Sequence, residues 1–340
     1  MIHVFFCPVS ECVHSSLWSL LLLSGYILTF LLGVPANILA FCTFYRKVRR
    51  RAAPIDILLF NLTISDLIFL AILPFKMKEA SDNMAWQLPY PLCPFSIFPF
   101  YVTIYNSTLV LTAVSVERYL GVAYPLRYAL CRRPRYAVLA SITFWVVTSL
   151  NLSIVYIMPY TQWHKGEKSE NKSNSPTPPP TCYQNFTEDE LAILLPVRLE
   201  LFLFLFCIPF LICCFCYTNF ILILSRIPNV SRRRRLRAIG LVLSTLIVFT
   251  VCFGPYNASH VVGYVRHEDE CWRSVALLCS TFNACFDPII FYFSSAVVRR
   301  MLNQCFRSIM AKLHILRCGG ARQSCSKSDK YKEAAPPLKA

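Results

Sequence analysis

Residues 201–225 read LFLFLFCIPFLICCFCYTNFILILS, and none of these side chains carries a charge. Because an α-helix rises about 1.5 Å per residue, a run of this length can cross a hydrocarbon layer about 30 Å thick. The whole chain has the same character: of its 340 residues, 56% are hydrophobic and 15% are charged. This composition lies outside the range of soluble domains and indicates a membrane protein.

Seven apolar runs follow one another along the chain, and each is long enough to span a bilayer. They lie at Leu17–Tyr45, Ile55–Phe75, Pro91–Val114, Tyr136–Tyr160, Leu191–Ser225, Ala238–Tyr264 and Cys271–Val297. The sequence therefore predicts an all-α membrane protein built as a bundle of seven transmembrane helices. An odd number of crossings places the two termini on opposite sides of the membrane.

The distribution of basic residues predicts which side is which. Clusters of Lys and Arg follow the first, third, fifth and seventh runs, at residues 46–51, 127–135, 226–237 and 299–307. Since Lys and Arg are enriched in cytoplasmic loops, we expect an extracellular N-terminus and a cytoplasmic tail. The net charge of +16 does not indicate a nucleic-acid partner, because the clusters adjoin membrane ends, where they suit anionic membrane lipid and a cytoplasmic protein. A charge run is also commonly just a solvated face.

The same pattern divides the chain into four segments. They are an extracellular N-terminus at residues 1–16, the seven-helix domain at 17–297, a short amphipathic eighth helix at 298–318, and a disordered cytoplasmic tail at 319–340. Cys305 and Cys318 of the amphipathic segment are candidates for palmitoylation at the inner membrane surface.

The predicted outer face carries sites for two modifications. Asn171 and Asn185 stand in N-x-S/T sequons and are candidates for glycosylation. Cys93 opens the third run, and Cys182 lies in the loop before the fifth. An oxidising exterior would let these two cysteines pair and pull the loop over the bundle.

Ionisable residues inside the predicted membrane need a partner or a function. Asp66, in the second run, should line a hydrated cavity or bind an ion such as sodium; the alternative is a protonated carboxyl that is hydrogen-bonded in the core. No other cofactor and no metal cluster is expected. At the end of the third run, Glu117 can hold Arg118 in an ion pair between neighbours, a latch that opens when the helix ends move.

Arg198 opens the fifth run, and no residue one helical turn away can neutralise it. Arg273 opens the seventh run, so both guanidinium groups can converge on one cavity and hold a carboxylate through paired hydrogen bonds. Tyr256 and His260, four residues apart on the sixth run, can face the same cavity. Purely structural roles are the alternatives. Arg198 could be a rim cation whose charged end reaches the water, Arg273 could pair with neighbouring acids, and His260 could be an ordinary core histidine.

A set of residues that covers all seven runs resembles the landmarks of rhodopsin-like G-protein-coupled receptors. The set is Asn37, Leu62, Asp66, Cys93, Glu117-Arg118-Tyr119, Trp145, Cys182, Pro209, Tyr217, Cys252-Phe253-Gly254-Pro255 and Asp287-Pro288. The resemblance implies that Glu117, Arg118, Tyr119, Asp66, Phe253, Pro255, Asp287 and Pro288 take part in activation. Phe253 and Phe291 depart from the family, which usually has tryptophan and tyrosine at these positions.

Within this class, the stretches around Arg198, His260, Arg273 and Phe291 resemble the short-chain branch of the free fatty acid receptors. The resemblance implies that Arg198 and Arg273 hold the ligand carboxylate with help from Tyr256, His260 and Tyr101. Tyr101 could equally be plain core. Two positions depart from these relatives: Asn151 replaces a histidine, and Gln184 replaces a loop glutamate, so the loop carboxylate that would occupy the arginines without ligand is not expected here.

The sequence therefore predicts a receptor for acetate, propionate and butyrate, and no enzyme. The implied partners are heterotrimeric G proteins of the Gi/o class, with Gq as a further one, together with arrestin and a second receptor copy as a dimer. Two alternatives stay open. One is a receptor for another anion, such as a longer fatty acid, a hydroxy acid or a nucleotide; the other is a transporter, against which the lack of an inverted repeat argues.

Overall fold

The computed structural model describes residues 16–50, 52–131, 133–158, 181–184, 186–228, 231–270, 272–294 and residue 307. The chain divides into a unit that ends at Phe291 and a second unit that begins at Tyr292. Almost all described residues belong to the first unit. Asn171, Asn185, Cys305, Cys318 and the predicted tail lie outside the described residues, as does the predicted eighth helix apart from Arg307.

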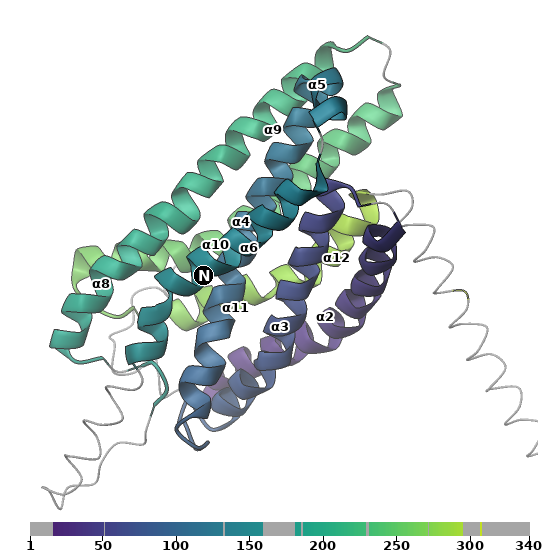
Figure 1. The fold of residues 1–340 in the computed structure, drawn as a ribbon. Helices are drawn as coiled ribbons and strands as arrows, with labels where there is room; N and C mark the ends of the chain where they lie inside the picture. Colours follow the sequence, from purple (N-terminus) through teal and green to yellow (C-terminus); the bar gives the residue numbers. More distant parts are fainter. Residues whose placement is uncertain are drawn as a thin grey trace, which may run out of the picture. The chain divides into compact units, whose positions relative to one another are not determined.

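All regular structure among the described residues is helical (Figure 1). The elements are α2 (Ser16–Arg50), α3 (Pro54–Ser81), α4 (Leu92–Ala123), α5 (Pro125–Cys131), α6 (Pro134–Asn151), α8 (Glu188–Phe202), the π-helix η2 (Leu203–Cys207), α9 (Ile208–Arg226), α10 (Arg232–Arg266), α11 (Arg273–Thr281) and α12 (Asn283–Ser294). The helix α4 occupies the centre, since it packs against α3, α6, α9 and α10.

Length and composition allow six stretches of the described chain to cross a membrane. They are Leu17–Arg50, Pro54–Ser81, Leu92–Ala123, Glu188–Arg226, Arg232–Arg266 and Arg273–Phe291. The helix α6, with 18 residues, is a seventh. Large apolar side chains cover outward faces, among them Leu31, Leu150 and Phe215, as expected of helices that face lipid. The seven-helix prediction is thus confirmed.

The fifth predicted run is a single stretch in the sequence but three elements in the structure. The helix α8 passes through the π-helix η2 into α9, and Pro209 is the second residue of α9. Proline has no N–H group and its ring crowds the preceding turn, so the widened turn accommodates it without ending the helix. The π-helix therefore lies directly before the turn that contains Pro209. The seventh run is likewise divided, into α11 and α12.

Some polar side chains inside the bundle form hydrogen bonds between helices. Asn37 of α2 donates to the Ala284 carbonyl oxygen of α12 at 2.7 Å. Trp145 of α6 donates through Nε1 to Asn61 of α3 at 2.8 Å. These bonds fix the register of neighbouring helices, for which apolar contact alone is not directional.

Two glycines test the tightness of this packing. A Cβ atom at Gly25 of α2 would lie 2.7 Å from both Cδ atoms of Leu278 in α11, whereas a Cβ atom at Gly240 of α10 would meet nothing within 4 Å. Both substitutions gain helix propensity, but Gly25→Ala must also displace the end of the Leu278 side chain, so its apparent midpoint of thermal unfolding in detergent should lie below that of Gly240→Ala. The control Gly240→Ala should leave the wild-type midpoint unchanged or raise it, since alanine favours helix. Equal midpoints for the two variants would contradict this packing.

Candidate functional site

A cavity of about 490 Å³ opens at the end of the bundle where the loop containing Cys182 crosses it. Its walls come from α2, α3, α4, α8, α11, the loop around Tyr183 and the loop between α10 and α11. The lining includes Tyr26, Lys76, Glu79, Tyr101, Tyr183, Gln184, Phe186, Arg198, Asp269, Arg273 and Leu277. The cavity thus contains both predicted arginines.

The two arginines converge on one carboxylate. Arg198 of α8 donates through Nη1 to Asp269 Oδ1 at 2.8 Å, and Arg273 of α11 donates through Nη1 to the same oxygen at 3.2 Å. Both guanidinium side chains are buried, with 4% and 11% of their surface exposed, whereas the Asp269 side chain is 30% exposed. Two buried cations are therefore held together by a carboxylate at the cavity mouth.

Each guanidinium group has further contacts that fix its plane. Arg273 donates through Nη2 to Tyr256 Oη at 3.2 Å, and its Cζ lies 5.4 Å from the Tyr256 ring centroid. The Cζ atom of Arg198 lies 5.2 Å from the ring of Phe186. The Nε atom of Arg198 is buried and has no hydrogen-bond partner among the described residues. The arginine pair therefore keeps at least one buried donor unused, although a buried N–H is costly to leave unpaired.

Beneath the arginines lies a buried group of tyrosines and a histidine. The rings of Tyr256 and His260 are 4.6 Å apart, and the ring of Tyr101 stacks on Tyr256 at 5.9 Å. His260 Nε2 shares a 2.9 Å hydrogen bond with Tyr105 Oη. All five predicted binding residues thus form one contiguous group. Tyr105 was not predicted, although its position four residues after Tyr101 places it on the same face of α4.

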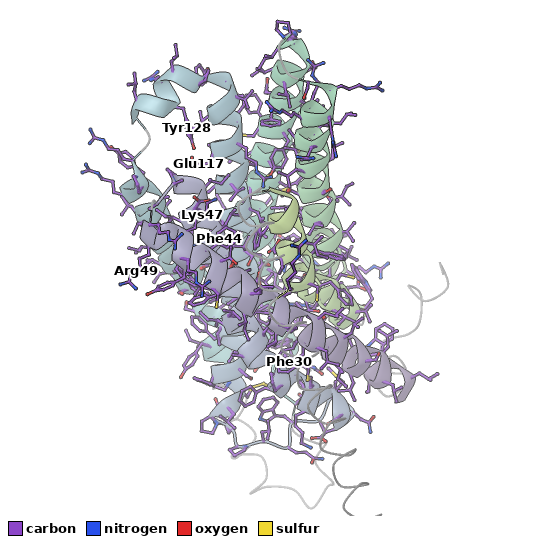
Figure 2. All side chains as sticks on the ribbon, turned by 90° about the vertical axis from the view of Figure 1, so that its right-hand side faces the viewer. Phe30, Phe44, Lys47, Arg49, Glu117 and Tyr128 are labelled. Carbon is purple, nitrogen blue, oxygen red and sulfur yellow. A yellow bond between two sulfur atoms is a disulfide. The ribbon has the colours of Figure 1, made fainter. Side chains whose placement is uncertain are left out.

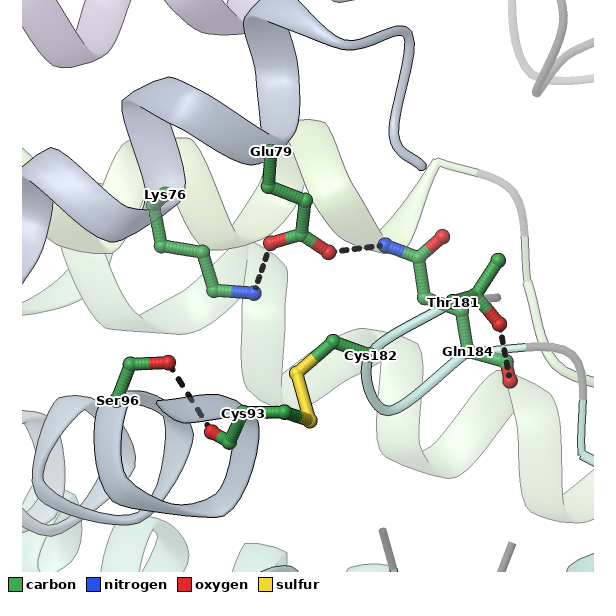
Figure 3. The surroundings of a disulfide bond; sticks show 7 residues. All are labelled: Lys76, Glu79, Cys93, Ser96, Thr181, Cys182 and Gln184. Carbon is green, nitrogen blue, oxygen red and sulfur yellow. Dashed lines mark hydrogen bonds and ion pairs between the residues drawn. A yellow bond between two sulfur atoms is a disulfide. The ribbon is translucent and has the colours of Figure 1, made fainter. Parts of the chain in front are cut away.

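The loop above the cavity is tied down by a disulfide. Cys93 and Cys182 are bonded, as the sequence predicted, and Figure 3 shows the surroundings. Gln184 donates to Glu79 Oε1 at 3.2 Å, and Lys76 pairs with Glu79 Oε2 at 2.7 Å. Gln184 therefore contacts α3 rather than the arginines. In the part of the chain that the structure describes, the carboxylate on the arginines comes from Asp269 alone.

Comparison with known proteins assigns the family. The sequence profile of the 7 transmembrane receptor (rhodopsin family) matches residues 36–291. Free fatty acid receptor 3 of Mus musculus is 51% identical over 276 residues, which cover 81% of this chain and 83% of the relative. Free fatty acid receptor 2 of Homo sapiens is 47% identical over 283 residues, covering 83% and 84%. The chain belongs to the free fatty acid receptor family.

This membership establishes the class of the molecule. The chain is a G-protein-coupled receptor of the rhodopsin family, and such proteins are receptors rather than enzymes, as the sequence predicted. Its similarity to these receptors identifies it as a multi-pass protein of the plasma membrane.

The receptor's Glu117 and Arg118 do not form the predicted latch. Tyr128 of α5 donates a short hydrogen bond to Glu117 Oε2 (Figure 2). Arg118 instead donates through Nη1 to Thr245 Oγ1 of α10 at 3.2 Å, and the ion pairs of the described residues include none between these neighbours. A pairing between adjacent residues was predicted because the sequence gives no sign of Tyr128, whose hydroxyl in α5 donates to the Glu117 carboxylate. Arg118 thus ties α4 to α10 directly.

The other predicted activation residues lie in the core or along the same helices. Asp66 is 3% exposed, and its Oδ2 atom has no hydrogen-bond partner among the residues that the structure describes. It borders a hollow of about 10 Å³ with Ser107 and Ser280. Asp287 accepts from Asn283 at 2.7 Å. Carboxylate and hydroxyl oxygens are suitable ligands for a hard cation, so this group fits a sodium ion chemically.

The remaining predicted activation residues are placed as follows. Phe253 packs edge-on against Phe249, and Tyr119 contacts Tyr124 and Phe215. Pro255 lies inside α10 and Pro288 inside α12.

The bridging contact has a consequence for stability at low pH. Burial by itself raises the pKa of the Asp269 carboxyl, but the guanidinium groups of Arg273 and Arg198 outweigh burial and hold that pKa below the usual aspartate value of 3.8. The carboxylate therefore stabilises the folded receptor above pH 3.8, and this contribution is lost as the pH falls through the lowered pKa.

Asp269→Asn should accordingly lower the thermal stability of the ligand-free receptor at pH 7, by about 1–3 kcal/mol for the lost charged hydrogen bonds. The difference from wild type should stay constant between pH 7 and 5 and shrink below about pH 4. Thermal unfolding of both purified proteins across this range measures it. A difference that widens on acidification would show that Asp269 is not held ionised by the arginines.

Proposed function

We propose that the receptor is activated by extracellular short-chain carboxylates such as acetate, propionate and butyrate, whose carboxylate binds between Arg198 and Arg273. One observation carries this proposal: both guanidinium groups already donate to a single carboxylate oxygen, that of Asp269. A site that holds one carboxylate from the chain has the geometry to hold one from a ligand. The relatives are named free fatty acid receptors, which supports this class of ligand.

The chemistry of the surrounding groups suits a small acid. Guanidinium groups match a carboxylate with parallel hydrogen bonds, and the unused Nε of Arg198 supplies one more donor. Tyr256 can add a hydroxyl contact, while His260 and Tyr105 satisfy each other behind it. Because Tyr101, Tyr105 and Tyr256 are all at most 5% exposed, they close the space beneath the arginines and favour a short acyl chain.

Ligand size limits the affinity. At about −1.5 kcal/mol per heavy atom, an acid of roughly four to six heavy atoms gains at most ~6–9 kcal/mol, so its dissociation constant can be no lower than about 40 μM for the smallest acid and about 0.3 μM for the largest. The cavity of about 490 Å³ extends past the arginines to Lys76 and Tyr26. This extra volume is the observation that favours the alternative, a larger anion such as a longer fatty acid, a hydroxy acid or a nucleotide.

Activation would follow as a shift between two populations of the bundle. A ligand carboxylate that binds Arg198 of α8 and Arg273 of α11 biases the spacing of these helices. Movement of α10 about Pro255 would then break the bond between Arg118 and Thr245 and open the opposite end to a G protein. In this proposal the N-terminus is extracellular, the basic start of α10 faces a Gi/o or Gq protein or arrestin, and Asp66 holds a sodium ion in the inactive state.

Substitution of the arginines tests the proposal. Arg198→Ala and Arg273→Ala should each weaken the response to propionate at least about 30-fold, since truncating one partner of a buried charge pair costs about 2–5 kcal/mol. The readout is G-protein activation in cells against acids of two to twelve carbons, at matched surface expression.

Arg266→Ala is the matched control, because Arg266 is an exposed rim cation that pairs with Glu270 and not with Asp269. It should respond as wild type does. A normal propionate response in both buried-arginine variants would refute the proposed site, and activation by long acids or nucleotides but not by propionate would favour the alternative ligand.

A further inference from the structure

Three consecutive acids, Glu268, Asp269 and Glu270, form the loop between α10 and α11, and they are not equivalent. Glu270 accepts from Arg266 at 3.2 Å and from Trp272 Nε1 at 2.9 Å, so it is held at the rim. Glu268 is exposed and makes no ion pair among the described residues. Only Asp269 contacts the two buried arginines. The occupation of the anion site is thus specific to one residue of the loop.

The backbone holds Asp269 in this place. His267, the residue after α10, caps the helix in the left-handed conformation, at φ 57°. The N–H groups of His267 and Glu268 both donate to the Gly263 carbonyl oxygen. A Cβ atom at Gly263 would lie 2.9 Å from the Glu268 carbonyl oxygen. Since this neighbour is backbone, a side chain at Gly263 would push the loop away. The turn therefore depends on glycine and delivers the next residue, Asp269, to the arginines.

The bridging carboxylate can leave its site more readily than the arginines can. The Asp269 side chain is 30% exposed and lies at the cavity mouth, whereas the arginine side chains are 4% and 11% exposed. Asp269 uses a single oxygen for both bonds. A free carboxylate could use both of its oxygens and reach the unpaired Nε of Arg198 as well. Exchange of one carboxylate for the other also leaves the net charge of the site unchanged.

We propose that Asp269 is an intramolecular competitor: it occupies the arginine pair in the ligand-free receptor and leaves when a carboxylate ligand binds. This inference rests on the proposed function and adds the residue that sets the threshold for the ligand. A group tethered by a short segment competes at an effective concentration on the order of millimolar. The receptor is thereby restricted to ligands present at high concentration, and Asp269 rather than a residue of the Cys182 loop imposes that restriction.

The test compares variants that remove the competitor with variants that remove an equal charge elsewhere. Asp269→Asn should raise the potency of propionate by about tenfold, the effect of losing a charge-assisted hydrogen bond in the ligand-free state. Gly263→Ala, which keeps every charge but displaces the turn, should raise potency in the same direction. Glu268→Gln and Glu270→Gln remove the same charge from the same loop and should leave potency within about twofold of wild type.

Two measurements are made on each variant: the concentration dependence of G-protein activation at matched surface expression, and the midpoint of thermal unfolding with and without saturating propionate. Competition predicts that Asp269→Asn lowers the ligand-free midpoint and enlarges the stabilisation by propionate. If Asp269 had a purely structural role, Asp269→Asn would lower both the ligand-free midpoint and the stabilisation by propionate.

The outcomes separate the two proposals. If Arg198→Ala and Arg273→Ala lose the response while Asp269→Asn has unchanged or weaker potency, competition is refuted and the proposed function stands. If Glu268→Gln raises potency as much as Asp269→Asn, loop charge alone explains the gain, and competition is again refuted. If both arginine variants respond normally, the proposed function fails, and the competition fails with it.

Discussion

Two guanidinium groups buried at one end of a membrane bundle must be neutralised, and this requirement governs the organisation of the site. An arginine removed from water is costly unless a carboxylate lies against it in good geometry. Arg198 and Arg273 come from helices far apart in the sequence, and Asp269 satisfies both through one oxygen. The chain itself supplies the anion that neutralises the arginine pair, and in the proposed function a ligand carboxylate takes its place.

The surrounding structure serves to keep these three residues in register. The disulfide between Cys93 and Cys182 fixes the loop that carries Phe186 over Arg198. A capping box between Thr187 and Glu190 starts α8, the helix that carries Arg198. The glycine turn after α10 sets Asp269, and Tyr256 aligns the plane of Arg273. Each of these contacts fixes either the backbone or the plane of a side chain, and together they hold the arginine pair and Asp269 in place.

Much of this was accessible from the sequence because it depends on composition and local spacing. Hydrophobic runs define membrane crossings almost regardless of tertiary context, so the helices were predicted well. The disulfide was predictable because Cys93 and Cys182 both lie at the predicted outer face, where an oxidising exterior lets cysteines pair. Arg198 stood out because no residue one helical turn away can neutralise it, and an ionisable residue in an apolar run needs a partner or a function.

Contacts between distant elements were not accessible in this way. The sequence showed Asp269 only as a neighbour of Arg273, four residues away, and gave no sign that the loop would also reach Arg198. Glu117 accepts a hydrogen bond from Tyr128 instead of pairing with Arg118, because the short helix α5 after α4 brings Tyr128 next to Glu117. Each of these depends on where a loop or turn is placed in space, and residue types alone do not fix that.

A structure of the receptor bound to propionate, determined by electron cryo-microscopy and compared with the ligand-free form, tests the central claim most directly. The account predicts that the propionate carboxylate lies within about 3 Å of both guanidinium groups, hydrogen-bond distance, and that the Asp269 side chain has turned away from them. Propionate bound elsewhere in the bundle, with Asp269 still bridging Arg198 and Arg273, would contradict it.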